Sequence, residues 1–312
     1  SCASCHIDAR TDRLAWDLGN PAGDEVEIGE QFIQPSDPPM PWHPLKGPLL
    51  TQTLLDIVGK EPFHWRGDRD GIEAFNPAFE SLLGDDEQLS TSEMQELEDF
   101  LATIWLPPNP FRPLDNSLPT DLALSGHYAT GELAPAGSPM PNGNAVRGKE
   151  LFRPPFLRDP QGACSACHAL PATFGSNHFA SGSEFLPNET GPNGERHHAL
   201  ISFQGEIFKV QSLRTLYERF GFECTQLESV SGFGYLHNGS VDSLTRFVSE
   251  PIFGLADIQE AADMVAYVLC ISGELEPPGP PTITPFYEPP TARGGKSLHA
   301  AAKMNCGTIV LG

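Results

Sequence analysis

Apolar side chains recur at helical spacing in the first half of the chain, directly after a pattern that favours a helix start. Ser90 and Glu93 have the spacing of a capping box. The apolar positions that follow keep the helical period and then meet two consecutive prolines: Met94, Leu97, Leu101, Ile104, Trp105, Pro107 and Pro108. We therefore expect a helix from Ser90 that ends at the prolines.

The second half predicts three shorter helices. One runs from Asn144 to Phe152, and another starts near Ser240. The latter turns its apolar side chains inward at Leu244, Phe247 and Val248. The third starts at Asp257, with Glu260 in the capping-box position. Its apolar face carries Ile258, Ala262, Val265 and Leu269.

Strand signals are weak until Asn305 to Leu311, and 30 Gly with 31 Pro among 312 residues indicate many long connections. The class is therefore mainly α. We divide the chain into an N-terminal domain (1–115), a linker (116–143), a C-terminal domain (144–275) and a Pro-rich extension (276–312). The extension reads as the start of a further module.

The charge is strongly acidic, with 41 acidic residues against 19 basic ones and a net charge of −22. Nucleic acid is excluded as a natural partner, because phosphate binding needs a basic surface. A basic electron donor is favoured by electrostatic steering, and plain solubility of an exported protein explains the charge equally well. No run of 18 apolar residues exists, so we expect no membrane span.

The motif Cys-x-x-Cys-His occurs twice. It is typical of c-type haem attachment, in which two thiols bond to the haem vinyl groups and the adjacent His ligates the iron. Such Cys pairs also bind zinc, but zinc ribbons space their pairs by roughly 15–20 residues. Here the pairs lie half a chain apart and His follows both. We predict two covalent haem c groups, held by Cys2, Cys5 and His6 and by Cys164, Cys167 and His168.

Haem attachment requires export, so we expect a periplasmic, cell-surface or extracellular protein. Of the 7 cysteines, Cys224, Cys270 and Cys306 are left. We favour a Cys224–Cys270 disulfide because both flank one compact segment, and closing that loop would stabilise the fold by about 3–4 kcal/mol. A cytochrome domain normally has a helix before this motif, whereas this chain starts one residue before Cys2. We therefore expect a fragment or processed product of a larger protein.

Several short segments, correctly ordered, resemble bacterial dihaem cytochrome c peroxidases. They are Lys46 to Pro48, Phe63 to Arg69, Arg147 to Phe152, Phe208 to Arg214, Gly234 to Ser240 and the helix containing Leu244. The resemblance covers most of residues 1–273, with insertions. The wider superfamily includes the dihaem methylamine-utilisation enzyme and rubber oxygenases. The fold implied is two class I cytochrome c domains that meet at an interface. To these the sequence itself adds long loops and a short β-like C-terminal extension.

The resemblance also implies roles for particular residues. The N-terminal haem is the reaction site, the C-terminal haem accepts electrons, and a Trp lies between them. By motif match that Trp is Trp65, and the alternative is an ordinary buried Trp. His43 falls near the family's removable distal His, with a surface-loop His as the alternative. His64 is a second candidate, although its neighbour Trp65 should direct it elsewhere.

On the distal side of the first haem, the family uses a Gln and a Glu to move the peroxide proton and polarise the O–O bond. Glu73 and Glu80 are the substitutes in this chain. Phe75 and Phe79 lie between these two residues in the sequence. These two rings either pack in the core or line a distal pocket, as in the rubber oxygenases.

The second haem lacks the family's Met ligand, because Phe247 to Gly254 contains no Met. We rank His299 first as its sixth ligand, with Met304 and His178 as alternatives, and we expect Met264 to be core. The resemblance gives His237 a supporting role near the interface. A calcium ion between the domains is usual in the family, with largely carbonyl ligands, and is a candidate cofactor here. Gln211 replaces a Pro near that site.

Three functions compete. The first is a peroxidase-like oxidoreductase, in which a small cytochrome c or cupredoxin delivers electrons at the His168 haem and peroxide is reduced at the His6 haem. The second is a non-enzymatic electron-transfer module of a larger surface or periplasmic protein, with two closed low-spin haems. The third is a dioxygen-using oxidase or oxygenase on the same scaffold. We rank them in that order and leave open a homodimer or larger assembly.

Overall fold

The computed structural model describes residues 2–17, 26–27, 41–42, 48–61, 63–65, 69–152, 164, 168, 189–190, 196–197, 199–201, 207–209, 211–219, 234–239 and 241–271. Its α-helices are α1 (Pro77–Ser81), α2 (Thr91–Leu101), α3 (Ala145–Phe152), α5 (Leu244–Val248) and α6 (Ile258–Leu269). Short 3-10 helices are η1 (Cys2–Ser4), η2 (Ile7–Ala9), η4 (Ile72–Phe75), η5 (Leu216–Arg219) and η6 (Pro251–Phe253). In this part of the chain, no helix is long and apolar enough to cross a membrane.

The strands are very short and pair locally. They are β1 (Ala15–Trp16), β2 (Val26–Glu27), β3 (Pro41–Trp42), β4 (Leu49–Leu50), β5 (Glu189–Thr190), β6 (Arg196–His197), β7 (Ala199–Ile201) and β8 (Ile207–Lys209). They form antiparallel pairs β1–β4, β2–β3, β5–β6 and β7–β8. Helices therefore form most of the regular structure in the described residues.

The helix starts follow the capping signals. The Ser90 hydroxyl accepts from the Glu93 amide while the Glu93 carboxylate accepts from the Ser90 amide at 2.9 Å, which is a complete capping box for α2. The helix ends at Leu101, before the prolines, and Trp105 beyond it is 59% exposed. The Asp257 carboxylate caps α6 by accepting from two backbone amides. The helix predicted near Ser240 starts at a capping Ser243.

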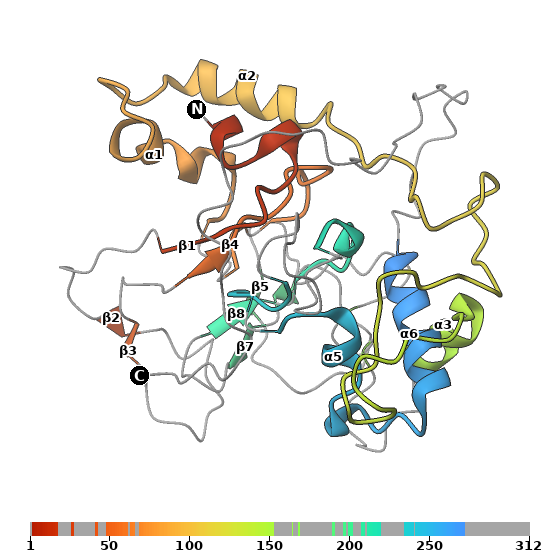
Figure 1. Cartoon of the computed structure of the whole chain (residues 1–312). Coiled ribbons are helices and arrows are strands. Elements are labelled where there is room, and N and C mark those ends of the chain that lie inside the picture. Colours follow the sequence, from red (N-terminus) through yellow and green to blue (C-terminus); the bar gives the residue numbers. More distant parts are fainter. Residues whose placement is uncertain are drawn as a thin grey trace, which may run out of the picture.

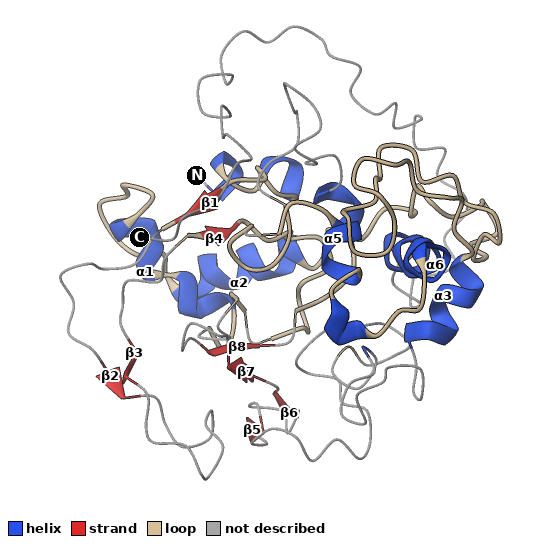
Figure 2. Cartoon of the chain, turned by 60° about the horizontal axis from the view of Figure 1, so that its bottom comes forward, coloured by secondary structure: helices blue, strands red, loops and turns tan. Residues whose placement is uncertain are grey.

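The larger core surrounds α6. Helix α6 is buried over most of its length and packs against α3 and α5, and the three lie together in both views (Figures 1 and 2). Met264 is a core residue of this group, which confirms the sequence prediction. Where α3 meets α6, a Cβ on Gly148 would lie 1.9 Å from the Asp263 carbonyl oxygen, so only glycine permits this approach.

The segment 116–143, predicted as a linker, packs on this same core. It contributes Leu124, Ala129 and Met140 to the buried set. Just before it, Asn109 donates to the Leu269 carbonyl at 2.9 Å and the Arg112 guanidinium donates to the Cys270 carbonyl at 2.6 Å. These contacts satisfy carbonyls that the end of α6 would otherwise leave unpaired. The segment is therefore a structural layer over α6.

A smaller core lies in the first half, beside α2. It is built from Phe63, Ile72, Met94 and Leu101. Phe75 and Phe79 are partly buried and pack against this cluster, and their role in lining a distal pocket stays a prediction. Leu50 and Trp65 form a separate buried pair. That pair belongs to the junction where the two halves of the chain meet.

Candidate functional site

The first Cys-x-x-Cys-His motif forms one tight turn. The His6 amide donates to the Cys2 carbonyl at 2.9 Å, and the Cys5 amide approaches the same oxygen at 3.3 Å. A turn of this kind brings the first Cys and the His four residues later to the same side of the backbone. Cys2 is exposed and Cys5 is half-buried, and both are free thiols. All three side chains thus belong to one compact turn.

The His6 ring is held by a carbonyl from a distant part of the chain. Its Nδ1 lies 2.8 Å from the backbone oxygen of Gln52. A carbonyl can only accept, so Nδ1 carries the proton and Nε2 keeps a lone pair available to a metal. Burial lowers the pKa of His6, and the Gln52 carbonyl partly opposes that shift. A neutral imidazole with a free Nε2 is the ligand form that iron needs.

The second motif repeats this turn. The His168 amide donates to the Cys164 carbonyl at 2.8 Å, as His6 does to Cys2. Burial lowers the pKa of the His168 ring to about 4, and the backbone of Gln211 opposes that shift. His168 is therefore neutral near pH 7. Cys167 lies outside the described residues, so the comparison rests on Cys164 and His168.

The residues that face the two histidines share a short sequence that motif reading missed. Gln52-Thr-Leu54 and Gln211-Ser-Leu213 are copies of Gln-[Ser/Thr]-Leu. In both, the hydroxyl accepts at 3.2 Å from the amide two residues later. Four residues after each Gln the backbone is left-handed, with φ 52° at Asp56 and 61° at Thr215. The repeated tripeptide was the signal available in the sequence.

The two glutamines meet through their side chains. The Gln52 amide nitrogen donates to the Gln211 amide oxygen at 2.5 Å. The Gln211 amide nitrogen donates in turn to the Trp65 carbonyl at 3.0 Å. These contacts fix the Gln211 amide orientation, because flipping it would set donor against donor and acceptor against acceptor. A continuous set of hydrogen bonds thus runs from His6 through the two glutamines to Trp65.

Trp65 occupies the centre of this junction. Its side chain is 8% exposed, and its indole nitrogen donates to the Leu50 carbonyl at 2.7 Å. The Arg219 guanidinium lies 5.3 Å from the ring centroid, in cation–π range. The His237 ring lies 6.4 Å away, and its backbone carbonyl accepts from the Leu50 amide. Trp65 and His237 therefore lie where residues from both halves of the chain meet.

Ion pairs also cross the junction. Arg214 is buried and donates to the Asp56 carboxylate at 2.6 Å. Lys60 lies 3.5 Å from the same carboxylate, and burial lowers the pKa of Lys60. Arg10, just after the first motif, pairs with the buried Glu218 of η5. Each cross-junction pair joins the first-motif half to the segment around Gln211.

The proposed acid–base residues lie on the protein surface. Glu73 on η4 and Glu80 on α1 are both exposed to solvent. The His64 ring packs edge-on against Phe75, with 4.8 Å between ring centroids. A charge on His64 would lower the pKa of His6, which places the two residues within electrostatic range. The catalytic roles of Glu73 and Glu80 stay predictions.

Several predicted ligands and cysteines lie outside the described residues, namely His43, His178, His299, Met304, Cys224 and Cys306. Cys270 is a buried free thiol whose sulfur lies 3.4 Å from the Phe111 carbonyl oxygen, and burial raises its pKa to about 12. The Cys224–Cys270 disulfide stays a prediction. Across the described ranges, no three His, Cys, Asp or Glu side chains gather to hold a metal ion. The calcium ion that the resemblance implies between the domains also stays a prediction.

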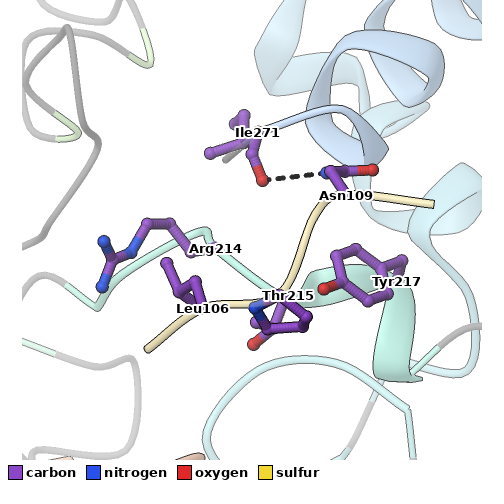
Figure 3. A pocket seen from close by; sticks show the side chains of 7 residues that line it. Leu106, Asn109, Arg214, Thr215, Tyr217 and Ile271 are labelled. Carbon is purple, nitrogen blue, oxygen red and sulfur yellow. Dashed lines mark hydrogen bonds between the residues drawn. The ribbon is translucent and has the colours of Figure 1, made fainter. Parts of the chain in front are cut away.

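A small hollow lies beside the junction (Figure 3). It is lined by Leu106, Pro107, Asn109, Arg214, Thr215, Tyr217 and Ile271. Its free space suits about one water molecule, which is far too little for an organic substrate. Asn109 donates across its edge to the Ile271 carbonyl at 3.2 Å. The hollow is a packing feature where the 106–109 segment passes the end of α6.

Comparisons with known proteins gave one structural likeness. No family model matches the chain, and no curated protein matches it. A solved structure of hydrazine synthase from Kuenenia stuttgartiensis, pressurised with xenon, aligns over 86% of this chain and 80% of that chain. The TM-score is 0.47 and the sequence identity is 17%. This likeness assigns neither a fold nor an activity to the chain.

Proposed function

We propose that this protein is a dihaem c-type oxidoreductase of peroxidase-like activity, built from two class I cytochrome c domains. Cys164, Cys167 and His168 would hold the haem at which electrons enter, and Cys2, Cys5 and His6 would hold the haem at which hydrogen peroxide would be reduced to two waters with two electrons and two protons. The observation that carries the proposal is the pair of matching Cys-x-x-Cys-His turns, with His6 committed through Nδ1 to a carbonyl.

The donor set fits haem c. Cys2, Cys5 and His6 would hold one group, and Cys164, Cys167 and His168 the other. When bound, such a group supplies reversible one-electron chemistry at iron. The chain supplies orientation: the Gln52 carbonyl fixes the His6 ring, which favours a basic, well-positioned ligand. Trp65 is buried and contacts Leu50 and Gln211, and we assign it the role of the intervening Trp that the resemblance implies.

The physiological setting follows from the same proposal. A covalently haem-loaded protein is matured outside the cytoplasm, so we place it in the periplasm, at the cell surface or outside the cell. A small basic cytochrome c or cupredoxin suits the net charge of −22 as electron donor. Glu73 and Glu80 are the residues we assign to proton transfer at the His6 side.

The test is to produce the chain with a haem-maturation system and count its covalent haems by intact mass. Spin states are then recorded by optical and EPR spectroscopy in oxidised and half-reduced protein, followed by peroxide addition. We expect two covalent haems, an open site on the His6 haem after half-reduction, and peroxide-dependent oxidation of a reduced donor. The matched control replaces Cys2 and Cys5 with Ser, which should abolish peroxide turnover and keep the second haem.

One observation favours a second candidate. Glu73 and Glu80 are both exposed, so neither carboxylate of the pair assigned to proton transfer lies in a buried site. A protein that only carries electrons needs no such pair. If both haems are low-spin in every redox state and peroxide leaves the spectrum unchanged, the electron-transfer module replaces the peroxidase-like enzyme.

A further inference from the structure

The two proximal histidines are linked through one pair of glutamines. The Gln52 backbone oxygen contacts the His6 ring, and the Gln52 side chain contacts the Gln211 side chain. The backbone of Gln211 lies beside the buried His168 ring, close enough to act on it electrostatically, although His168 Nδ1 makes no hydrogen bond within the described residues. Each glutamine therefore faces one histidine with its backbone and the other glutamine with its amide.

The surroundings of the pair resist rearrangement. The amide of Gln211 is engaged at both ends, by Gln52 at 2.5 Å and by the Trp65 carbonyl at 3.0 Å. Each glutamine is followed by the same hydroxyl-closed turn and the same left-handed residue. The Arg214–Asp56 ion pair joins these two turns directly. A displacement of one Gln backbone is thus transmitted to the other, because the amide contact and the ion pair hold the two turns together.

We propose that Gln52 and Gln211 are positioning residues that couple the two haem sites, so that the reduction potential of each haem depends on both glutamines. The inference rests on the proposed dihaem function. The strength of the hydrogen bond at Nδ1 sets the basicity of a ligating His and so biases the oxidation state it favours. Coupling of this kind is reciprocal, so each site must affect the other equally in free energy.

The experiment compares wild type, Gln52→Leu, Gln211→Leu and the double variant, all haem-loaded. Leucine removes the amide contact and keeps the backbone carbonyl. Gln95→Leu is the matched control, because Gln95 is exposed on α2 and bonds only to Glu98 and Asp99 of its own helix. Midpoint potentials come from spectroelectrochemical titration, with each haem assigned by its EPR signal. Resonance Raman spectra report the iron–histidine stretch.

We expect either single variant to raise both midpoint potentials, because each loosens the Gln52 carbonyl contact with His6 and shifts the Gln211 backbone beside His168. The expected size is about tenfold in the reduction equilibrium, or 59 mV for one electron. The iron–histidine stretch should fall at both haems. The double variant should match Gln211→Leu, since the contact between the two glutamines can be lost only once, and Gln95→Leu should change nothing.

The coupling is overturned if Gln52→Leu moves only the His6 haem and Gln211→Leu only the His168 haem, or if neither potential moves. Should a leucine variant fail to fold, Gln→Met at the same position keeps the side-chain length and answers the same question. The haem count in wild type is measured first. Fewer than two covalent haems refutes the proposed function. Two haems, with each variant shifting the potential of one haem only, refute the coupling through the glutamines alone.

Discussion

Trp65 stabilises the junction through contacts of three kinds. Its indole nitrogen donates to the Leu50 carbonyl, its own carbonyl accepts from Gln211, and its ring receives the Arg219 guanidinium. Burial lowers the pKa of Arg219 to about 10, so this side chain still carries its charge at neutral pH. A single residue thus joins a hydrogen bond, an amide contact and a cation–π contact at the point where the two halves meet.

Replacing this residue by Phe should cost stability. Trp65→Phe leaves the buried Leu50 carbonyl without its donor and weakens the contact with Arg219, so we expect a loss of about 1–3 kcal/mol in unfolding free energy. Denaturant unfolding measures the change. Trp105→Phe is the control, because Trp105 is 59% exposed and should change stability by less than about 0.5 kcal/mol. Equal effects of both substitutions would contradict this assignment.

His127 makes stability depend on pH. It is 3% exposed, and burial lowers its pKa from 6.5 to about 4. As pH falls, His127 therefore takes up a proton near pH 6.5 in the unfolded chain but only near pH 4 in the folded chain. Stability is lost as pH falls through this window, by an amount on the order of 3 kcal/mol.

The measurement is denaturant unfolding at several pH values for wild type and His127→Leu. Other groups titrate in the same range, so the difference between the two proteins isolates His127. We expect the stability of wild type relative to His127→Leu to fall steadily from pH 7 to pH 4, by about 3 kcal/mol in total. A difference that stays constant over this range would show that His127 is not held neutral by burial.

At the scale of elements, local signals were sufficient where the partners are close in sequence. Ser90 and Glu93 cap α2 because both lie within one turn, and Asp257 caps α6 for the same reason. The end of α2 was placed too late, because Ile104 and Trp105 keep the helical period although the helix has ended at Leu101. The role of 116–143 was also not visible, because its Gly and Pro content resembles a linker whereas Leu124, Ala129 and Met140 are core.

Helices α3 and α6 make the tightest contact in the described part of the second half. Gly148→Ala would place a methyl group 1.9 Å from the Asp263 carbonyl oxygen, so the helices must separate. We expect a loss of about 3 kcal/mol or more, at the upper end of overpacking costs. Thermal and denaturant unfolding measure it. Val146→Ala on the same helix is the control, since Val146 is 43% exposed. A Gly148→Ala variant with unchanged unfolding free energy would disprove the close approach of α3 to α6.

At the scale of the whole molecule, the junction depends on contacts between residues far apart in sequence. Gln52 contacts Gln211, Asp56 pairs with Arg214, and Arg10 pairs with Glu218. No local pattern specifies such pairs, which is why the motifs predicted the histidines and the Trp but not the glutamines that connect them. The repeated Gln-[Ser/Thr]-Leu becomes meaningful only when both copies are seen to face a motif His.

The net charge of −22 should govern how electrons are delivered. Opposite charge steers a basic donor to the protein. Because salt screens this attraction, its range is about 30 Å at 0.01 M ionic strength but only about 10 Å at 0.1 M. We expect the second-order rate of electron transfer from a reduced basic cytochrome c to fall about tenfold or more between these ionic strengths in stopped-flow measurements. An acidic cytochrome c is the control, and its rate should rise with salt as repulsion is screened. If both donors give flat salt profiles, the charge serves solubility and steers no partner.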